Sequence, residues 1–135
     1  MRSERPHRKL LVWQESRKLV KTIYQITQKF PDSERFGLIS QLRRASVSVP
    51  TNISEGAARN TKKEFAQFLY ISRGSLSEVD TLLTIAFDLE YLSETEYESV
   101  ISHADKISAM LNGLIKNIKS QIKQAKTSLP HSLIT

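Results

Sequence analysis

Side chains that support catalysis or bind metals are sparse in this sequence. It has three histidines, His7, His103 and His131, and no cysteine, which excludes thiolate nucleophiles and cysteine-ligated zinc. A carboxylate-bridged di-iron site in a helix bundle needs two Glu-x-x-His motifs, and the sequence does not contain that pair. We therefore predict no metal site and no cofactor, and we place His103 on a helix surface.

The glycine-rich and nucleophile motifs of common enzymes are also missing. The four glycines form no Gly-x-Ser-x-Gly elbow, no phosphate loop and no dinucleotide-binding fingerprint. We therefore predict that the protein is not an enzyme and has no catalytic residues.

The remaining chemistry lies in basic side chains that could contact phosphates. Four lysines at 3-4-3 spacing, here called the lysine stripe, are Lys116, Lys119, Lys123 and Lys126. Four further candidates for nucleic-acid binding are Arg43, Arg44, Lys62 and Lys63. No aromatic residue is interleaved with the lysine stripe, so we expect contacts to phosphates without base stacking or sequence preference. The alternative is that the lysines only complement the dipole of a helix C-terminus.

Charge is distributed unevenly along the chain, whose formal net charge is +6. Residues 1–63 carry 14 Lys and Arg against 5 Asp and Glu, residues 64–105 carry 1 against 9, and residues 106–135 carry 5 against none. Such asymmetry favours either binding to a nucleic acid or docking of oppositely charged segments on one another. The sequence leaves both interpretations open.

A line of polar residues beside a proline is the other unusual feature. One face of a predicted helix carries Gln41, Ser48, Asn52, Glu55 and Arg59, here called the polar line. Pro50 lies inside the same helix, where a proline removes one hydrogen bond and clashes with the preceding turn, so we predict a bend there. The polar line either contacts a neighbouring helix or subunit, or is a solvated edge with one Glu55–Arg59 ion pair.

Four helical segments must position these residues. Apolar residues recur at helical spacing over about 8–29, 34–58, 61–89 and 93–123. Asp32 or Ser33 is expected to cap the second segment, and capping boxes at 61–64 and 93–96 open the third and fourth. Long helices with short connections predict an all-α fold, an antiparallel up-down-up-down four-helix bundle with a kinked second helix.

The chain divides into a basic N-terminal arm over 1–9, a bundle domain over 10–126 and a flexible tail over 127–135. No apolar run is long enough to span a membrane. The N-terminus lacks the apolar stretch of a secretory signal. We therefore expect a cytoplasmic protein with no membrane partner.

The third helical segment carries more apolar surface than one bundle core uses. One stripe, between Phe65 and Ala86, is expected to face the core. A second stripe, roughly 90–120° away at 100° per residue, contains Phe68, Ile71, Leu82 and Ile85. We assign this second stripe to an oligomer interface, because large exposed apolar patches usually mark interfaces. The alternative is a broad stripe in a thick core.

Several motifs together resemble one known family. The stretch 30–45 reads FPxxExxGLxxQLRRA and the stretch 48–59 reads SVPxNIxEGxxR. Shorter matches are Leu10-x-Val12-Trp13, Phe65, Phe68-Leu69 and Gly74-Ser75-x-x-Glu78. These motifs resemble the four-helix-bundle family named for proteins encoded in intervening sequences of bacterial 23S rRNA genes. The resemblance covers about residues 10–118, with small departures at Val49 and Ser54.

The resemblance implies an antiparallel four-helix bundle that assembles as a ring-like homopentamer in a bacterium, and it implies no particular activity. Accessory proteins of diversity-generating retroelements are similar at the level of fold, and they are basic pentameric bundles that bind nucleic acid and a reverse transcriptase. We therefore expect a non-enzymatic oligomer that binds RNA or DNA nonspecifically through basic patches. The alternative is a protein-interaction scaffold with a protein partner and no nucleic-acid role.

Overall fold

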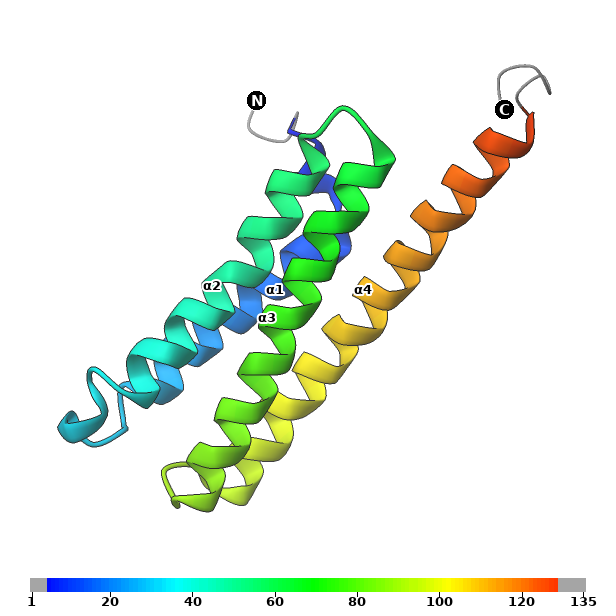
Figure 1. The fold of residues 1–135 in the computed structure, drawn as a ribbon. Coiled ribbons are helices and arrows are strands. Elements are labelled where there is room, and N and C mark those ends of the chain that lie inside the picture. Colours follow the sequence, from blue (N-terminus) through cyan, green and yellow to red (C-terminus); the bar gives the residue numbers. More distant parts are fainter. Residues whose placement is uncertain (1–4, 129–135) are drawn as a thin grey trace.

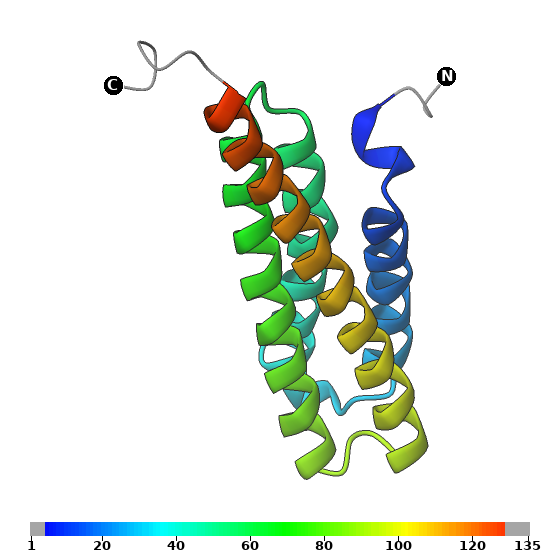
Figure 2. The same cartoon turned by 90° about the vertical axis from the view of Figure 1, so that its right-hand side faces the viewer.

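The computed structural model describes residues 5–128, which fold into four long helices (Figure 1). The helices are α1 (Leu11–Thr27), α2 (Leu38–Ala57), α3 (Lys62–Asp88) and α4 (Glu94–Ser128). Two short 3-10 turns, η2 (Pro6–Lys9) and η3 (Asp32–Glu34), precede α1 and α2. Successive helices run in opposite directions (Figures 1 and 2). The predicted antiparallel all-α bundle is therefore confirmed, and the described residues contain no strand.

One apolar core lies between the four helices. Most of the apolar positions predicted to face it are buried, and Leu19, Leu42, Leu69 and Leu111 have no exposed surface, whereas Phe65 at the start of the predicted α3 stripe is only half-buried. Val100, Ile107 and Leu111 of α4 are all buried. The core therefore uses a broad apolar face of α4.

The start of α2 differs from the prediction. The helix begins at Leu38 rather than near residue 34, and its N-cap is Gly37, which has no capping side chain. Glu34 supplies the cap, because its Oε1 accepts a hydrogen bond from the Leu38 backbone N–H at 3.3 Å. The prediction that Asp32 or Ser33 caps this helix is wrong, because the chain first makes the turn η3 and a longer side chain then reaches the helix end.

Capping boxes open α3 and α4 as predicted. In the second box the pairing is fully reciprocal: the Glu96 N–H donates to Ser93 Oγ at 3.1 Å, and the Ser93 N–H donates to Glu96 Oε1 at 3.1 Å. In the first box the Glu64 N–H donates to Thr61 Oγ1 at 3.2 Å. The Thr61 hydroxyl in turn donates to Glu64 Oε1 at 3.0 Å, so the carboxylate takes the hydroxyl instead of a backbone donor.

The helices α2 and α3 pack more closely than any other pair. At Gly56 an added Cβ would lie 2.8 Å from the Cβ of Phe68 and 3.1 Å from the carbonyl oxygen of Phe65. Nearer the middle of the helix, the buried Ser72 hydroxyl of α3 donates to the carbonyl of Val49 at 2.5 Å. Small residues therefore let the two backbones approach, and α2 remains helical through Pro50. The bend at Pro50 stays a prediction.

Both ends of the described chain differ from the predicted boundaries. The helix α4 continues to Ser128 rather than ending near Lys123, so it includes residues assigned to the tail. At the other end, His7 packs edge-on against Trp13 with ring centroids 4.7 Å apart, and Gln14 donates to the Arg8 carbonyl at 2.9 Å. Residues 5–9 of the expected arm are thus packed on the bundle. The predicted tail beyond residue 128, with His131, lies outside the described residues.

Candidate nucleic-acid interface

The antiparallel topology brings three basic segments to one end of the bundle. The C-terminal half of α4, the connection between α2 and α3, and η2 all lie at this end (Figures 1 and 2). The N-terminal side chains of η2 meet the last turns of α2, since Arg5, Pro6 and His7 line one surface pocket with Ser54 and Glu55. We call this region the basic end.

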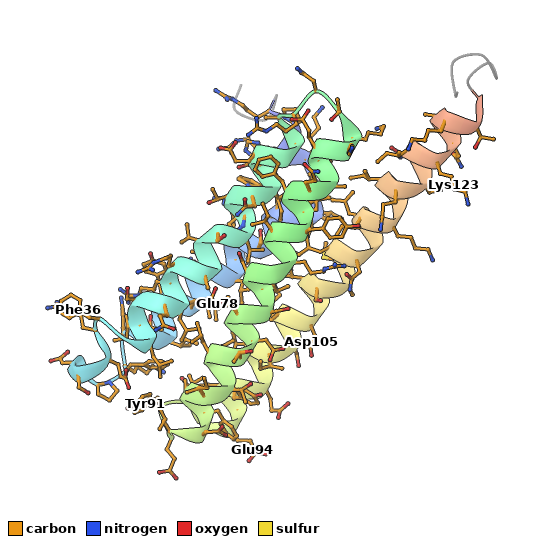
Figure 3. The ribbon with its side chains drawn as sticks, in the orientation of Figure 1. Phe36, Glu78, Tyr91, Glu94, Asp105 and Lys123 are labelled. Atoms are coloured by element: carbon orange, nitrogen blue, oxygen red, sulfur yellow. The ribbon has the colours of Figure 1, made fainter. Side chains whose placement is uncertain are left out.

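The lysine stripe runs along the exposed side of α4 toward the basic end. All four of its lysines are exposed. Farther from the basic end, Ser77 of α3 and Asp105 of α4 line one small surface pocket, which shows that these two residues lie side by side. Lys63 and Lys119 lie about four turns from this pocket toward the basic end, on α3 and α4 respectively. Lys119 is therefore level with Lys63, and the lysine stripe continues beyond the start of α3. Lys123 lies far from Glu94, which is at the opposite end of α4 (Figure 3).

The two predicted arginines lie elsewhere. Arg43 is held against the end of α1: its Nε donates to Thr27 Oγ1 at 3.0 Å, and its guanidinium lies 4.5 Å from the centroid of the Tyr24 ring. Arg44 is exposed and donates to the Ser40 hydroxyl at 3.3 Å. The structure thus places Lys62 and Lys63 at the same end of the bundle as the lysine stripe, but it places Arg43 and Arg44 toward the opposite end of α2.

Arg73 is a basic residue that the sequence analysis did not single out. It is the one Lys or Arg within residues 64–105. It lies beside the lysine stripe, where its Nη1 donates to Asn112 Oδ1 of α4 at 3.1 Å. Its isolation in an otherwise acidic segment could have marked Arg73 as a candidate for binding. The sequence alone does not show which α4 residue it faces.

Part of the polar line contacts the neighbouring helix α3, and part of it faces solvent. Ser48 Oγ and Ser75 Oγ are 2.8 Å apart across the α2–α3 contact, and Asn52 Nδ2 donates to the Ser48 carbonyl and hydroxyl at 2.8 and 2.9 Å. Glu55 of α2 and Arg59, just beyond the end of that helix, form a 3.5 Å ion pair. Ser48 therefore contacts the neighbouring helix, and the Glu55–Arg59 pair has the geometry of the solvated edge.

Arg59 and Gln41 complete the polar line. The Arg59 guanidinium also lies 4.7 Å from the centroid of the Phe68 ring on α3, so the far end of the line does reach the neighbouring helix. Gln41, at the other end, is exposed.

The predicted oligomer stripe is only partly exposed. Leu82 is buried in the core at 7% exposure, so its assignment to the surface stripe is corrected. It lies at the edge of the broad apolar face that α3 turns toward the bundle. Phe68 is half-buried. Ile71 and Ile85 are 52% and 41% exposed, and Leu89 on the same line is 48% exposed.

Acidic residues gather at the end opposite the basic end, where α3 finishes and α4 starts. Lys29, just beyond α1, pairs there with Glu96 at 2.7 Å. This hydrogen bond and the backbone N–H of Ser93 lower the pKa of Glu96 to about 2. Glu78, Glu94 and Asp105 are exposed, and all three lie nearer to this end than Lys123 does (Figure 3).

A single carboxylate, that of Glu15, joins α1 to α4 through several basic partners. Glu15 accepts from Lys18 at 2.8 Å and contacts His103 Nε2 at 2.9 Å. The Lys18 hydrogen bond, followed by that to His103, lowers the pKa of Glu15 to about 2. His103 was expected on a plain helix surface, but it is half-buried and bridges two helices.

Within residues 5–128, no group of three or more histidine, aspartate or glutamate side chains is placed to hold a metal ion. None of the helices in this part combines the length and the apolar character needed to cross a membrane.

Comparison with known proteins gives a family. The family model described as 23S rRNA-intervening sequence protein matches residues 8–113. A similar solved structure is a protein of unknown function from the S23 ribosomal protein family of Bacteroides thetaiotaomicron. It shares 22% identity and a TM-score of 0.73, covering 78% of this chain and 96% of that chain, which shows the fold alone. No curated protein matches. Because the family model spans most of the chain, the protein belongs to the 23S rRNA-intervening sequence protein family.

Proposed function

We propose that the protein is a non-enzymatic homo-oligomer that binds RNA or DNA through phosphates at its basic end, without sequence preference. The observation that carries this proposal is the position of the cations. Lys63 at the start of α3 and Lys119 in the C-terminal half of α4 come to the same end of the bundle, while most of the carboxylates of α3 and α4 lie toward the other end.

The lysines of the basic end have no acidic partner among the described residues. Across residues 5–128, no carboxylate lies within ion-pair distance of Lys62, Lys63 or any lysine of the lysine stripe. By contrast, Lys18, Lys29 and Lys106 each pair with a glutamate. Dipole complementation accounts for one or two cations in the last turn of a helix, but the stripe spans about three turns. An extended unpaired stripe fits a polyanion better.

We further propose that the oligomer is a pentamer, as the family resemblance implies. The exposed apolar residues on α3 support self-association. Ile71 and Leu89 lie about five turns apart, and therefore on the same face, with Ile85 close to that line. Gly74 lies beside it, and no atom lies within 4 Å of the position that an added Cβ would take there, which allows a neighbour to approach closely. Repetition of the basic end around a ring would let several weak phosphate contacts act together.

Light scattering after gel filtration tests the assembly. We expect a pentameric mass for the wild type. Ile71→Glu or Ile85→Glu should dissociate the oligomer and leave the helical circular dichroism largely intact, because both side chains are substantially exposed in a single chain. The surface variant Thr81→Glu, on the same helix, serves as the control for added charge. A wild-type monomer at micromolar concentration would refute self-association.

Changing the lysines tests the binding surface. Replacing all four residues of the lysine stripe by Gln should flatten the dependence of nucleic-acid affinity on salt, because each lost phosphate contact removes about one released counterion. A matched comparison of two charges is Lys123→Gln with Lys126→Gln against Lys21→Gln with Arg35→Gln. The first pair should weaken binding more than the second, and equal effects would place the contact elsewhere.

The second candidate function is a protein-interaction scaffold. Most of the carboxylates of α3 and α4 lie away from the unpaired lysines of the basic end. This favours the scaffold, since those lysines could dock an acidic protein partner. Nucleic-acid binding that is absent at low salt would give this function first place. In either case we propose a cytoplasmic role in a bacterium, which cell fractionation would test.

A further inference from the structure

The fold places an aromatic ring against the lysine stripe that the sequence of α4 does not contain. Tyr70, in the third turn of α3, is half-buried. The Lys119 ammonium lies 5.4 Å from the centroid of its ring, and the Arg73 guanidinium lies 5.0 Å from the same centroid. Two cations from different helices therefore share one tyrosine.

Arg73 is oriented by neutral groups. Its partners are the Asn112 side-chain oxygen at 3.1 Å and the Tyr70 ring. No carboxylate in the described residues pairs with it. Arg73 is therefore held in one position while its full charge remains available, and guanidinium planes stack on both aromatic rings and nucleobases.

We propose that Tyr70 and Arg73 form a stacking platform for one unpaired base, with Lys116 and Lys119 placed to contact the phosphates beside it. This inference rests on the proposed function and makes it more specific, because the ligand becomes single-stranded RNA or DNA. A duplex keeps its bases stacked on one another and cannot offer a free base face. Every base has such a face, so the platform selects strandedness and not sequence.

Electrostatics alone predicts the opposite preference. Duplex DNA has the higher charge density, and binding through phosphates alone gains more from it. A preference for single strands at equal salt is therefore a signature of stacking. We expect wild-type protein to bind a labelled mixed-sequence single strand of about 16 nucleotides roughly tenfold more tightly than the matching duplex.

The most selective variant is the one that keeps the positive charge of Arg73 and removes its planar guanidinium group. Arg73→Lys should lower affinity for the single strand about five- to tenfold and leave duplex affinity unchanged, because the ammonium still attracts phosphate but cannot stack as a flat group. Tyr70→Leu should behave similarly and retain an apolar side chain at a half-buried position. Arg35→Lys, an exposed arginine toward the opposite end of the bundle, is the control and should change neither affinity.

The outcomes separate this inference from the proposed function. Equal binding of single strands and duplexes, or an Arg73→Lys variant with wild-type affinity for the single strand, would overturn the stacking platform and leave the phosphate contacts of the basic end standing. If wild-type protein binds neither form at about 50 mM salt, the proposed function fails and the stacking platform fails with it. Unchanged duplex binding by both variants shows that they are folded.

Discussion

The contact between α2 and α3 at Gly56 gives a prediction whose sign follows from the geometry. In Gly56→Ala the new Cβ would lie 2.8 Å from Phe68 Cβ, 2.9 Å from Phe65 Cδ1 and 3.1 Å from the Phe65 carbonyl. One of these contacts is with backbone, which cannot rotate away. Forcing an extra carbon into a packed contact costs about 1–3 kcal/mol.

Helix propensity acts in the opposite direction. Alanine is more favourable than glycine inside a helix by about 1 kcal/mol, which offsets part of the steric penalty. We therefore expect Gly56→Ala to lower the free energy of unfolding by up to about 2 kcal/mol, or Tm by up to about 8 °C for a chain of this size. Thermal and urea unfolding followed by circular dichroism, at one protein concentration, measure the change.

Gly113 supplies the matched control. It lies inside α4, and no atom lies within 4 Å of an added Cβ there. Gly113→Ala should therefore raise the free energy of unfolding by about 0.5–1 kcal/mol through propensity alone. If Gly56→Ala stabilises the protein as Gly113→Ala does, then the close approach of α2 and α3 is wrong.

Three other changes have expected outcomes. Glu90 has a φ of 63° at the end of α3, so Glu90→Gly should raise stability by about 0.5–1 kcal/mol in urea unfolding, and a loss would argue against the left-handed turn. Glu55→Ala should cost no more than about 0.5 kcal/mol, because the Glu55–Arg59 pair is exposed; a larger loss would show that another subunit covers it. The pKa values of Glu15 and Glu96 are lowered to about 2, so their stabilisation is present above about pH 5 and is lost as pH falls toward 2. The Tm difference between wild type and Glu15→Gln or Glu96→Gln should therefore shrink between pH 7 and pH 2.5, and a constant difference would contradict the ion pairs.

Helix periodicity predicted the architecture because each core position repeats at a spacing that only one secondary structure explains. Val12, Leu42 and Leu69 are buried for that reason. The two capping boxes were also readable, since their donors and acceptors are three residues apart. Features that depend on local sequence could therefore be predicted from the sequence alone.

Features that depend on contacts between helices could not be predicted from the sequence in this way. Leu82 was assigned to the surface because a helical wheel gives an angle but not the width of the face that neighbours cover. The Tyr70–Lys119 contact joins residues far apart in sequence, so no spacing rule indicates it. Glu34 capped α2 in place of Asp32 because side-chain reach, and not position alone, decides a cap.

The salt dependence of nucleic-acid binding tests the central claim most directly. Fluorescence anisotropy of a labelled oligonucleotide, titrated with wild-type protein at about 50 and 200 mM salt, measures it. Several simultaneous phosphate contacts at the basic end predict that affinity falls at least about tenfold over this range. An affinity that does not change with salt, or no binding at about 50 mM, would contradict the account.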